Sequence, residues 1–284
     1  MLPGCSVLRL DCNGKLLDLS RPQVMGVLNV TPDSFSDGGD FLDPQRALDH
    51  ALQMQEEGAA VIDIGGESTR PGAAPVSAPD ELQRVIPVID ALQAQLIVPI
   101  SIDTRKPEVM QAAVAAGAGL INDVNALRAP AALEAAAASA VPVCLMHMQG
   151  DPRTMQSDPH YRDVVEEVKA FLMQRAAACE AAGIGRERLL LDPGFGFGKT
   201  VEHNLRLLAR LDELAAPGLP VVVGLSRKSM IGKLLDLDVT ERLPASIALA
   251  VLAVERGARL VRAHDVGATW QALQMQFALT DLRN

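Results

Sequence analysis

The sequence predicts a (β/α)8 barrel preceded by a short β-hairpin, and three observations support this fold class. Short apolar runs alternate with helical patterns eight times along the 284 residues. A polar residue stands at or just past the end of every run. Hydrophobic residues make up 49% of the chain but aromatic residues only 3%, so aliphatic side chains must fill the core, as they do around parallel strands buried on both faces.

The elements follow from these patterns in chain order. We expect the hairpin over residues 7–19, because Asn13-Gly14 accommodates a type I′ turn, and we expect it to close the N-terminal end of the barrel. The strands are predicted at 24–30, 60–64, 98–102, 119–121, 141–146, 189–191, 220–225 and 259–261. Apolar residues between them recur at helical spacing. A barrel of this type needs about 250 residues, so we expect one domain over 1–284, with the barrel over about 24–280.

Three of the strand-to-helix connections are long, namely residues 31–43, 68–79 and 149–160. Most such connections have only about 4–6 residues. The first two are rich in Pro, Gly, Ser and Asp, and we expect them to close over a ligand.

The polar residues that follow the runs are the candidate site residues. The carboxyl ends of all eight strands of such a barrel meet on one face, and that face holds the active site. The residues are Asn29, Glu67, Asp103, Asn122, His147, Asp192, Ser226 with Lys228, and Arg262 with His264.

Asp103, Asn122 and Asp192 end three different strands. Their oxygens suit a ligand with several N–H donors, such as an aminopyrimidine ring. The alternative is structural, because an Asp at a strand end can also cap the following helix.

Cationic residues follow the last two strands. Arg262 and His264 alternate along a strand and so point to the same side, while Arg227 and Lys228 follow Ser226. The ends of strands seven and eight often form a phosphate site, so these cations and Ser229 predict a site for phosphate or pyrophosphate. The alternative is solvated surface charge.

Residues 194–200 (GFGFGKT) are similar to a phosphate-binding loop but lack its first glycine, since that position holds Pro193. We interpret the stretch as a glycine-rich turn with Phe197 available to pack on a ligand. His147 fits a hydrogen-bonded core residue, and we expect no dedicated zinc site. A magnesium ion held by one amide oxygen and substrate phosphates is compatible with the sequence, and Asn29 is the best amide for it.

The composition excludes some classes of partner. The net charge of −9 argues against nucleic acid, which needs a basic footprint. No apolar run reaches the roughly 20 residues that span a bilayer. The four cysteines contain no CxxC pair and are interpreted as reduced thiols. We therefore expect a cytoplasmic protein that binds neither membrane nor nucleic acid.

Eight stretches, one per barrel unit and in order, contain distinctive motifs. They are 25–39 (MGVLNVTPDSFSDGG), 63–72 (DIGGESTRPG), 101–105 (SIDTR), 121–123 (IND), 145–150 (LMHMQG), 191–199 (LDPGFGFGK), 224–229 (GLSRKS) and 262–265 (RAHD). Together they resemble the dihydropteroate synthase family of folate biosynthesis. The resemblance implies a transferase that joins 4-aminobenzoate to 6-hydroxymethyl-7,8-dihydropterin diphosphate, releasing pyrophosphate. It also implies a homodimer, magnesium as cofactor and sulfonamides as competitive inhibitors.

The resemblance also implies roles for individual residues. The pterin would be bound by Asp103, Asn122, Asp192, Lys228, Met146 and Arg262. The catalytic group would be Arg262, His264, Lys228 and Asn29, with Asn29 also the metal ligand. The 4-aminobenzoate site would consist of Thr69, Arg70, Pro71, Phe197 and Ser229 together with Lys228, and Asp33 and Phe35 would belong to the first long loop.

An electron-rich dihydropterin can delocalise a cation, so we expect pyrophosphate to leave before the arylamine attacks. Three alternatives remain open: a pterin-dependent methyltransferase domain on the same barrel, a catalytically silent binding partner, and a Schiff-base aldolase using Lys228.

Overall fold

The eight apolar runs form a closed parallel barrel in the computed structural model, which describes residues 9–31, 44–68, 72–151 and 154–282. The strands are β3 (Gln23–Asn29), β4 (Ala59–Gly65), β5 (Ile100–Asp103), β6 (Leu120–Asp123), β7 (Val143–Met146), β8 (Leu189–Asp192), β9 (Val221–Gly224) and β10 (Ala258–Ala263). They pair in chain order, and β10 closes the ring by pairing with both β9 and β3. The predicted fold class is therefore confirmed.

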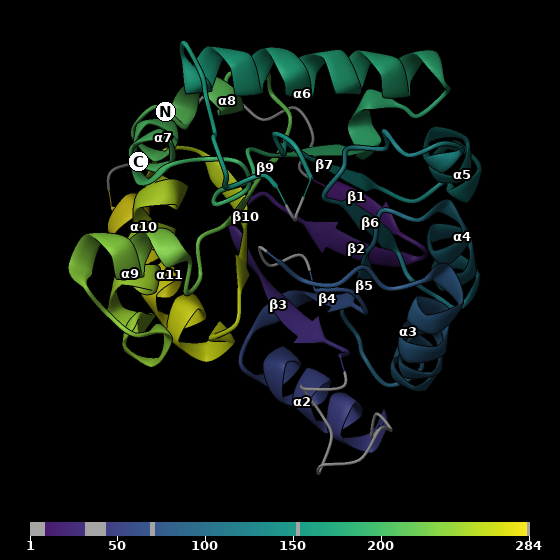
Figure 1. Cartoon of the computed structure of the whole chain (residues 1–284). Coiled ribbons are helices and arrows are strands. Elements are labelled where there is room, and N and C mark those ends of the chain that lie inside the picture. The colour runs from purple at the N-terminus through teal and green to yellow at the C-terminus, as the bar shows by residue number, and fades with distance from the viewer. Residues whose placement is uncertain (1–8, 32–43, 69–71, 152–153, 283–284) are drawn as a thin grey trace.

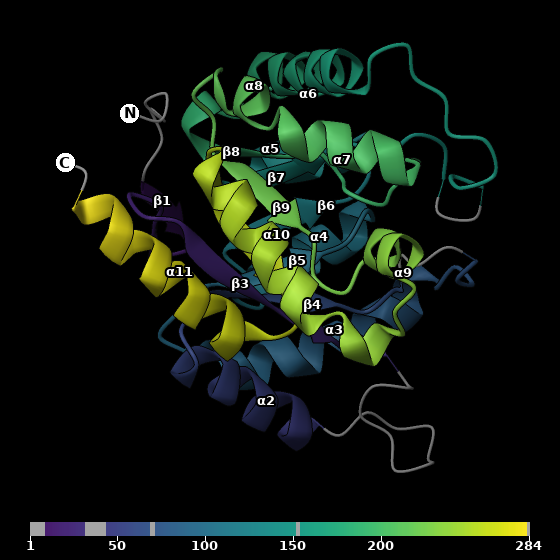
Figure 2. The same cartoon turned by 90° about the vertical axis from the view of Figure 1, so that its left-hand side faces the viewer.

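Helices surround the barrel (Figure 1). They are α2 (Pro44–Glu56), α3 (Ala78–Gln93), α4 (Pro107–Ala115), α5 (Ala132–Ser139), α6 (Val164–Ala181), α7 (Val201–Ala209), α8 (Asp212–Ala215), α9 (Ser229–Leu235), α10 (Leu243–Glu255) and α11 (Val266–Asp281), with 3-10 turns at Arg186–Arg188 and Val239–Glu241. The short helices α8 and α9 are additions to the simple alternation of strand and helix. Figure 2 shows α10 and α11 side by side on one flank of the barrel.

The N-terminal hairpin consists of β1 (Arg9–Cys12) and β2 (Lys15–Asp18), which pair antiparallel. Asn13 and Gly14 both have positive φ, 58° and 82°, as the predicted type I′ turn requires. The Lys15 ammonium donates to the carbonyls of Leu96 and Val98, just before β5. The hairpin therefore lies against the ends at which strands begin, opposite the predicted site.

Strand register determines which side chains meet inside the barrel. Asp63 of β4 stands level with Ser101 of β5, and Asp103 stands level with Asn122 of β6. Level residues on neighbouring strands point to the same face of a sheet, and the faces alternate along each strand. Polar side chains from β4, β5 and β6 are thus brought together within an otherwise aliphatic core.

Within the described ranges, no helix is both long and apolar enough to cross a membrane. Cys12, Cys144 and Cys179 are buried free thiols, as expected for these three cysteines.

Candidate active site

The centre of the candidate site is a buried arginine held between two carboxylates. Arg262, near the end of β10, donates from Nε to Asp63 Oδ2 at 2.6 Å and from Nη2 to Asp103 Oδ2 at 2.9 Å. The Asp63 side chain is fully buried and that of Arg262 is 23% exposed. One guanidinium thus links β10 to β4 and β5, across the intervening strand β3.

Burial and charge act in opposite directions on this group. Burial alone would lower the pKa of Arg262, but the carboxylates of Asp63 and Asp103 outweigh it and raise that pKa above its ordinary value. Burial raises the pKa of Asp103 to about 7, against the attraction of Arg262 and with a further contribution from Asp63. Because the pKa of Arg262 is raised, its guanidinium stays positively charged at every physiological pH.

Asp63 also fixes the orientation of Asn122, whose Nδ2 donates to Asp63 Oδ2 at 3.1 Å. Sequence reasoning did not assign Asp63 to the site. The available signal was a single carboxylate inside the aliphatic run of β4, at a point before the strand ends. A buried carboxylate at such a position requires partners, and here they are the guanidinium and the amide.

Three residues each keep one oxygen atom available at the mouth. Asp103 uses Oδ2 for Arg262, Asn122 uses its amide nitrogen for Asp63, and Asp192 accepts the Gly194 N–H on Oδ1 at 2.7 Å. Within the described part of the chain, the second Asp103 and Asp192 oxygens and the Asn122 carbonyl make no hydrogen bond, and they are not among the fully enclosed atoms. These three acceptors come from β5, β6 and β8, as predicted.

Lys228 and Phe197 form the next part of the site. The Lys228 ammonium lies 4.3 Å from the centre of the Phe197 ring, within the range of a cation–π contact. Burial lowers the pKa of Lys228 to about 8, although the nearby Asp192 carboxylate opposes the change. Phe197 packs in turn on a small apolar cluster that contains Met146, Val124, Met148 and Met155.

The glycine-rich turn is not a phosphate loop, as predicted. The Lys199 ammonium is only slightly exposed and donates to the carbonyls of Gly194 and Phe197, both at 3.0 Å, and lies 2.9 Å from His147 Nδ1. These contacts occupy the ammonium, so it has no N–H for a ligand. Burial lowers the pKa of Lys199 to about 7. His147 has the supporting role expected for it.

His264 lies beside Ser226 at the end of the barrel. Ser226 Oγ accepts the backbone N–H of His264 and lies 3.0 Å from its Nδ1. Burial, helped by Arg262, lowers the pKa of His264 to about 4, so the imidazole is neutral near pH 7. If the Ser226 hydroxyl donates to Nδ1, the proton is on Nε2 and is available to a ligand.

Arg227 does not join this cationic group. Its backbone is left-handed with φ of 56°, and its guanidinium pairs with both oxygens of Asp265. Of the four residues predicted as a cationic group around β9 and β10, Lys228 and Arg262 therefore remain, because His264 is neutral and Arg227 is paired with Asp265. Arg262 is also bound to Asp63 and Asp103, so the predicted phosphate site is in direct contact with the predicted acceptors.

Asn29 is the last residue of β3 and lies at the mouth. Its amide makes no hydrogen bond with any residue in the described ranges, so its oxygen is available to a hard cation such as Mg²⁺. The described residues contain no cluster of three or more His, Cys, Asp or Glu side chains that could hold a metal by themselves. A metal here would depend on oxygens of the substrate.

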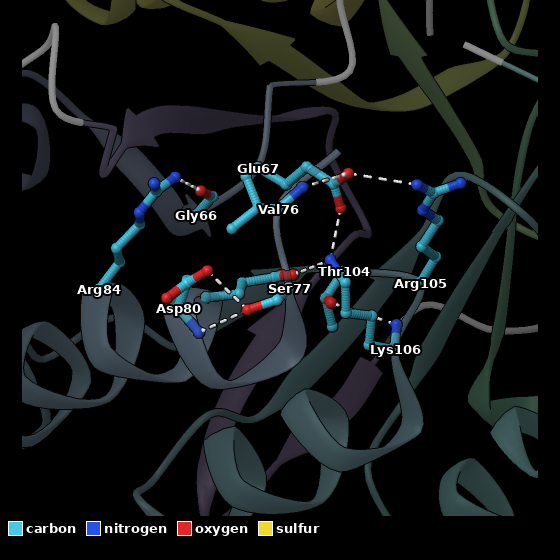
Figure 3. Close-up of polar contacts among 10 residues, drawn as sticks. Gly66, Glu67, Val76, Ser77, Asp80, Arg84, Thr104, Arg105 and Lys106 are labelled. Atoms are coloured by element: carbon cyan, nitrogen blue, oxygen red, sulfur yellow. Dashed lines mark hydrogen bonds and ion pairs between the residues drawn. The ribbon is translucent and has the colours of Figure 1, made fainter. Parts of the chain in front are cut away.

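Glu67, just past the end of β4, ties the second long loop to the segment that follows β5 (Figure 3). Its Oε1 accepts from Arg105 at 3.2 Å and from the Val76 N–H at 3.4 Å, and its Oε2 accepts from Lys106 at 2.5 Å. Lys106 also pairs with the buried Glu81. Glu67 is therefore a structural anchor and not a ligand-binding group.

The remaining predicted residues are only partly accounted for. Ser229 is exposed at the start of α9, next to Lys228. Thr69, Arg70 and Pro71, predicted for the aminobenzoate site, lie outside the described residues, as do Asp33 and Phe35 of the first long loop.

Comparison with known proteins identifies the class to which this site belongs. Residues 25–264 match the family of pterin-binding enzymes. The chain is 55% identical over 268 residues to dihydropteroate synthase of Escherichia coli strain K12, covering 94% of this chain and 95% of that protein.

Two solved structures extend the comparison. Xanthomonas albilineans dihydropteroate synthase with 4-aminobenzoic acid matches with a TM-score of 0.92 and 55% identity, covering 97% of this chain and 99% of that one. Yersinia pestis dihydropteroate synthase in a sulfonamide drug complex matches with a TM-score of 0.92 and 52% identity, covering 96% and 99%.

The barrel and its mouth thus define a pterin-binding enzyme. Within that class, the chain belongs to the dihydropteroate synthase family, and it is a transferase. This decides between the synthase and methyltransferase interpretations that the sequence left open.

The buried pair makes a stability prediction. Asp63→Asn removes one carboxylate beside a buried guanidinium, and breaking such a pair should lower the free energy of unfolding by about 3 kcal/mol. Denaturant unfolding measures this. The matched control is Asp18→Asn, which breaks the exposed pair with Arg9 and should change stability little. Equal effects of the two substitutions would contradict the importance given to Asp63.

Proposed function

We propose that the chain condenses 6-hydroxymethyl-7,8-dihydropterin diphosphate with 4-aminobenzoate to give 7,8-dihydropteroate and pyrophosphate. The observation that carries this proposal is the set of three free acceptors on Asp103, Asn122 and Asp192, next to the cations Arg262 and Lys228. The acceptors suit the N–H groups of an aminopyrimidine ring. The cations suit the charge of a leaving diphosphate.

The free acceptors would bind the N–H groups of the pterin ring and so orient the ring in the site. A carboxylate can accept two neighbouring N–H bonds from a flat ring, and Asp192 is already fixed by the Gly194 N–H. Asn122 presents its carbonyl because Asp63 holds its amide nitrogen. Met146 stands level with Asp192 on the neighbouring strand and would supply an apolar surface for the ring.

Arg262 and Lys228 stabilise the charge that develops as the C–O bond to the diphosphate breaks. Asp63 and Asp103 occupy two of the five guanidinium N–H donors of Arg262, which leaves three for a ligand. The neutral His264 adds an Nε2–H donor. Donors preorganised around a developing anion are worth about 2.7–4 kcal/mol each, so these groups favour loss of pyrophosphate before the amine attacks.

The second substrate would lie against Phe197, Lys228 and Ser229 at the outer part of the mouth. Its amine is neutral, so it needs no strong base. After the new C–N bond forms, the nitrogen loses its proton to solvent or to the departing pyrophosphate. A sulfonamide, which has the same arylamine shape, would compete for this position.

Magnesium is proposed as the cofactor. The support is the uncommitted Asn29 amide at the mouth, together with the preference of Mg²⁺ for a few protein oxygens plus substrate phosphates. When bound, the ion would neutralise charge on the diphosphate. Chelation with EDTA should stop pyrophosphate release, and added Mg²⁺ should restore it.

We propose a homodimer formed through α10 and α11. Leu252 on α10 is 39% exposed, and Met275 and Leu279 on α11 are 67% and 62% exposed. Exposed apolar groups on two packed helices suit contact with a second copy. Analytical ultracentrifugation should give twice the chain mass, and a Met275→Glu, Leu279→Glu double variant should sediment as a monomer.

We also propose the cytoplasm as its location, supported by the three buried free thiols, which suit a reducing compartment.

The function is tested by following pyrophosphate release. The purified chain should release pyrophosphate with Mg²⁺ and both substrates. Arg262→Ala should lower kcat by about 10²–10³-fold, because the lost donors act on charge that develops in the transition state. Arg259→Ala, near the other end of β10, is the control and should leave kcat unchanged. If Arg262→Ala turned over as fast as the parent, the assigned role would be wrong.

A pH prediction follows from Lys228. Its pKa is lowered to about 8, so the cation is lost as the pH rises through this value, and with it the attraction for diphosphate. Above pH 8, kcat/KM for the pterin diphosphate should fall about tenfold per pH unit. Lys228→Arg stays protonated and should move this fall to higher pH. An unchanged profile in that variant would assign the titration to another group, such as Lys199.

A further inference from the structure

The glycine-rich turn between β8 and α7 has one backbone hydrogen bond of its own, from the Phe197 N–H to the Gly194 carbonyl at 3.1 Å. Gly194, Gly196 and Gly198 all have positive φ, of 67°, 82° and 63°. A Cβ on Gly194 would lie 2.0 Å from the carbonyl oxygen of His147, and one on Gly198 would lie 2.5 Å from that of Gln149. The turn is therefore pressed against its neighbours, and its other peptide groups need partners from elsewhere.

A single buried ammonium supplies partners for two carbonyls of this turn. Lys199 Nζ donates to the carbonyls of Gly194 and Phe197 at 3.0 Å and lies 2.9 Å from His147 Nδ1. Burial lowers the pKa of His147 to about 2, with Lys199 contributing, so the imidazole is neutral and Nδ1 can accept. An ammonium has three donors and no acceptor. All three donors of Lys199 are engaged inside the protein.

Other side chains hold the alternate residues of the turn. The Gly196 N–H donates to Asn204 Oδ1 at 2.7 Å, the Gly196 carbonyl accepts from Gln156, and the Gly198 carbonyl accepts from the Tyr161 hydroxyl at 2.9 Å. Among the described side chains, Lys199 is the one bonded to the Phe197 carbonyl.

The turn touches two residues of the active site. The Gly194 N–H bonds Asp192, and the Phe197 ring lies 4.3 Å from the Lys228 ammonium. Lys199 is only 3% exposed. Its ammonium makes no hydrogen bond to Asp192 or Lys228 and contacts the backbone of the turn instead. Apart from its electrostatic attraction for Asp192, Lys199 reaches the substrate site through its contacts with the turn and with His147.

We propose that Lys199 is a positioning residue, which holds the Gly194 and Phe197 carbonyls and the His147 ring so that Phe197 stays over Lys228 and binds 4-aminobenzoate. This rests on the proposed function in one respect, the contact between Phe197 and 4-aminobenzoate. The cation that resembles a phosphate-loop lysine is thereby assigned a role in affinity for the second substrate.

Steady-state kinetics on the full chain with Mg²⁺ and both substrates test the proposal. Lys199→Met keeps an unbranched apolar stem and removes the donors. The KM for 4-aminobenzoate should rise about tenfold, the scale of a lost charged hydrogen bond. The kcat and the KM for the pterin diphosphate should change much less. Lys233→Met, an exposed lysine of α9, is the matched control and should change none of the three.

A double-mutant cycle separates positioning from a general structural effect. If Lys199 acts through Phe197, the Lys199→Met change should raise the KM for 4-aminobenzoate no further when Phe197→Leu is already present. If the two changes multiply, or if kcat and both KM values worsen together, the proposal is overturned. Should Lys199→Met fail to fold, Lys199→Gln keeps amide donors and should give a smaller rise in the same KM.

Hydrogen exchange on the unliganded protein tests the turn independently of any substrate. The peptide that spans residues 194–199 should exchange faster in Lys199→Met than in the parent or in Lys233→Met. Unchanged exchange overturns the proposal. If Phe197→Leu alone leaves the KM for 4-aminobenzoate unchanged, the proposed contact of Phe197 is wrong, and with it the substrate part of this inference, whereas faster exchange would still support the holding of the turn.

Discussion

The site depends on how one buried negative charge is paired. Asp63 points into the barrel from the middle of a strand and is fully buried. A carboxylate there is costly unless it is bonded to a cation or a strong donor. The guanidinium of Arg262 and the amide of Asn122 meet this need. Their orientations are therefore fixed before any substrate arrives.

This pairing creates the acceptors and donors that the reaction uses. Because Asn122 directs its nitrogen to Asp63, its carbonyl is left free, and this is the acceptor that we propose for the pterin. Because Arg262 uses only two of its donors on carboxylates, the other three remain free for the proposed contact with the diphosphate. Preorganised groups need little rearrangement when charge develops in the transition state. This preorganisation accounts for most of the rate enhancement in many enzymes.

The sequence predicted the barrel because the rules that govern it are local and periodic. Strand runs, helical spacing and the polar residues at strand ends can all be read within short windows. Asp103, Asn122, Asp192, Lys228 and Arg262 were found in this way, and the structure brings them together around one mouth.

The residues that were not predicted depend on contacts between distant segments. Asp63 precedes its strand end, and only the register with β5 and its distance to β10 show that it pairs with Arg262. Arg227 looks equivalent to Lys228 in the sequence, but its left-handed backbone directs the two side chains to different partners. That all three ammonium donors of Lys199 are hydrogen-bonded can be seen only once the positions of His147 and of the turn carbonyls are known.

The N-terminal hairpin covers the end of the barrel opposite the candidate site, and this limits how ligands reach the site. Leu10, Cys12, Leu17 and Leu19 belong to the main hydrophobic core, so the hairpin seals the end at which the strands begin. Ligands then enter and leave by one opening, with Asn122 buried at its base and Ser229 exposed at its rim. A group bound beside Asn122 would therefore lie deeper in the barrel than one bound beside Ser229, and both would share the same opening.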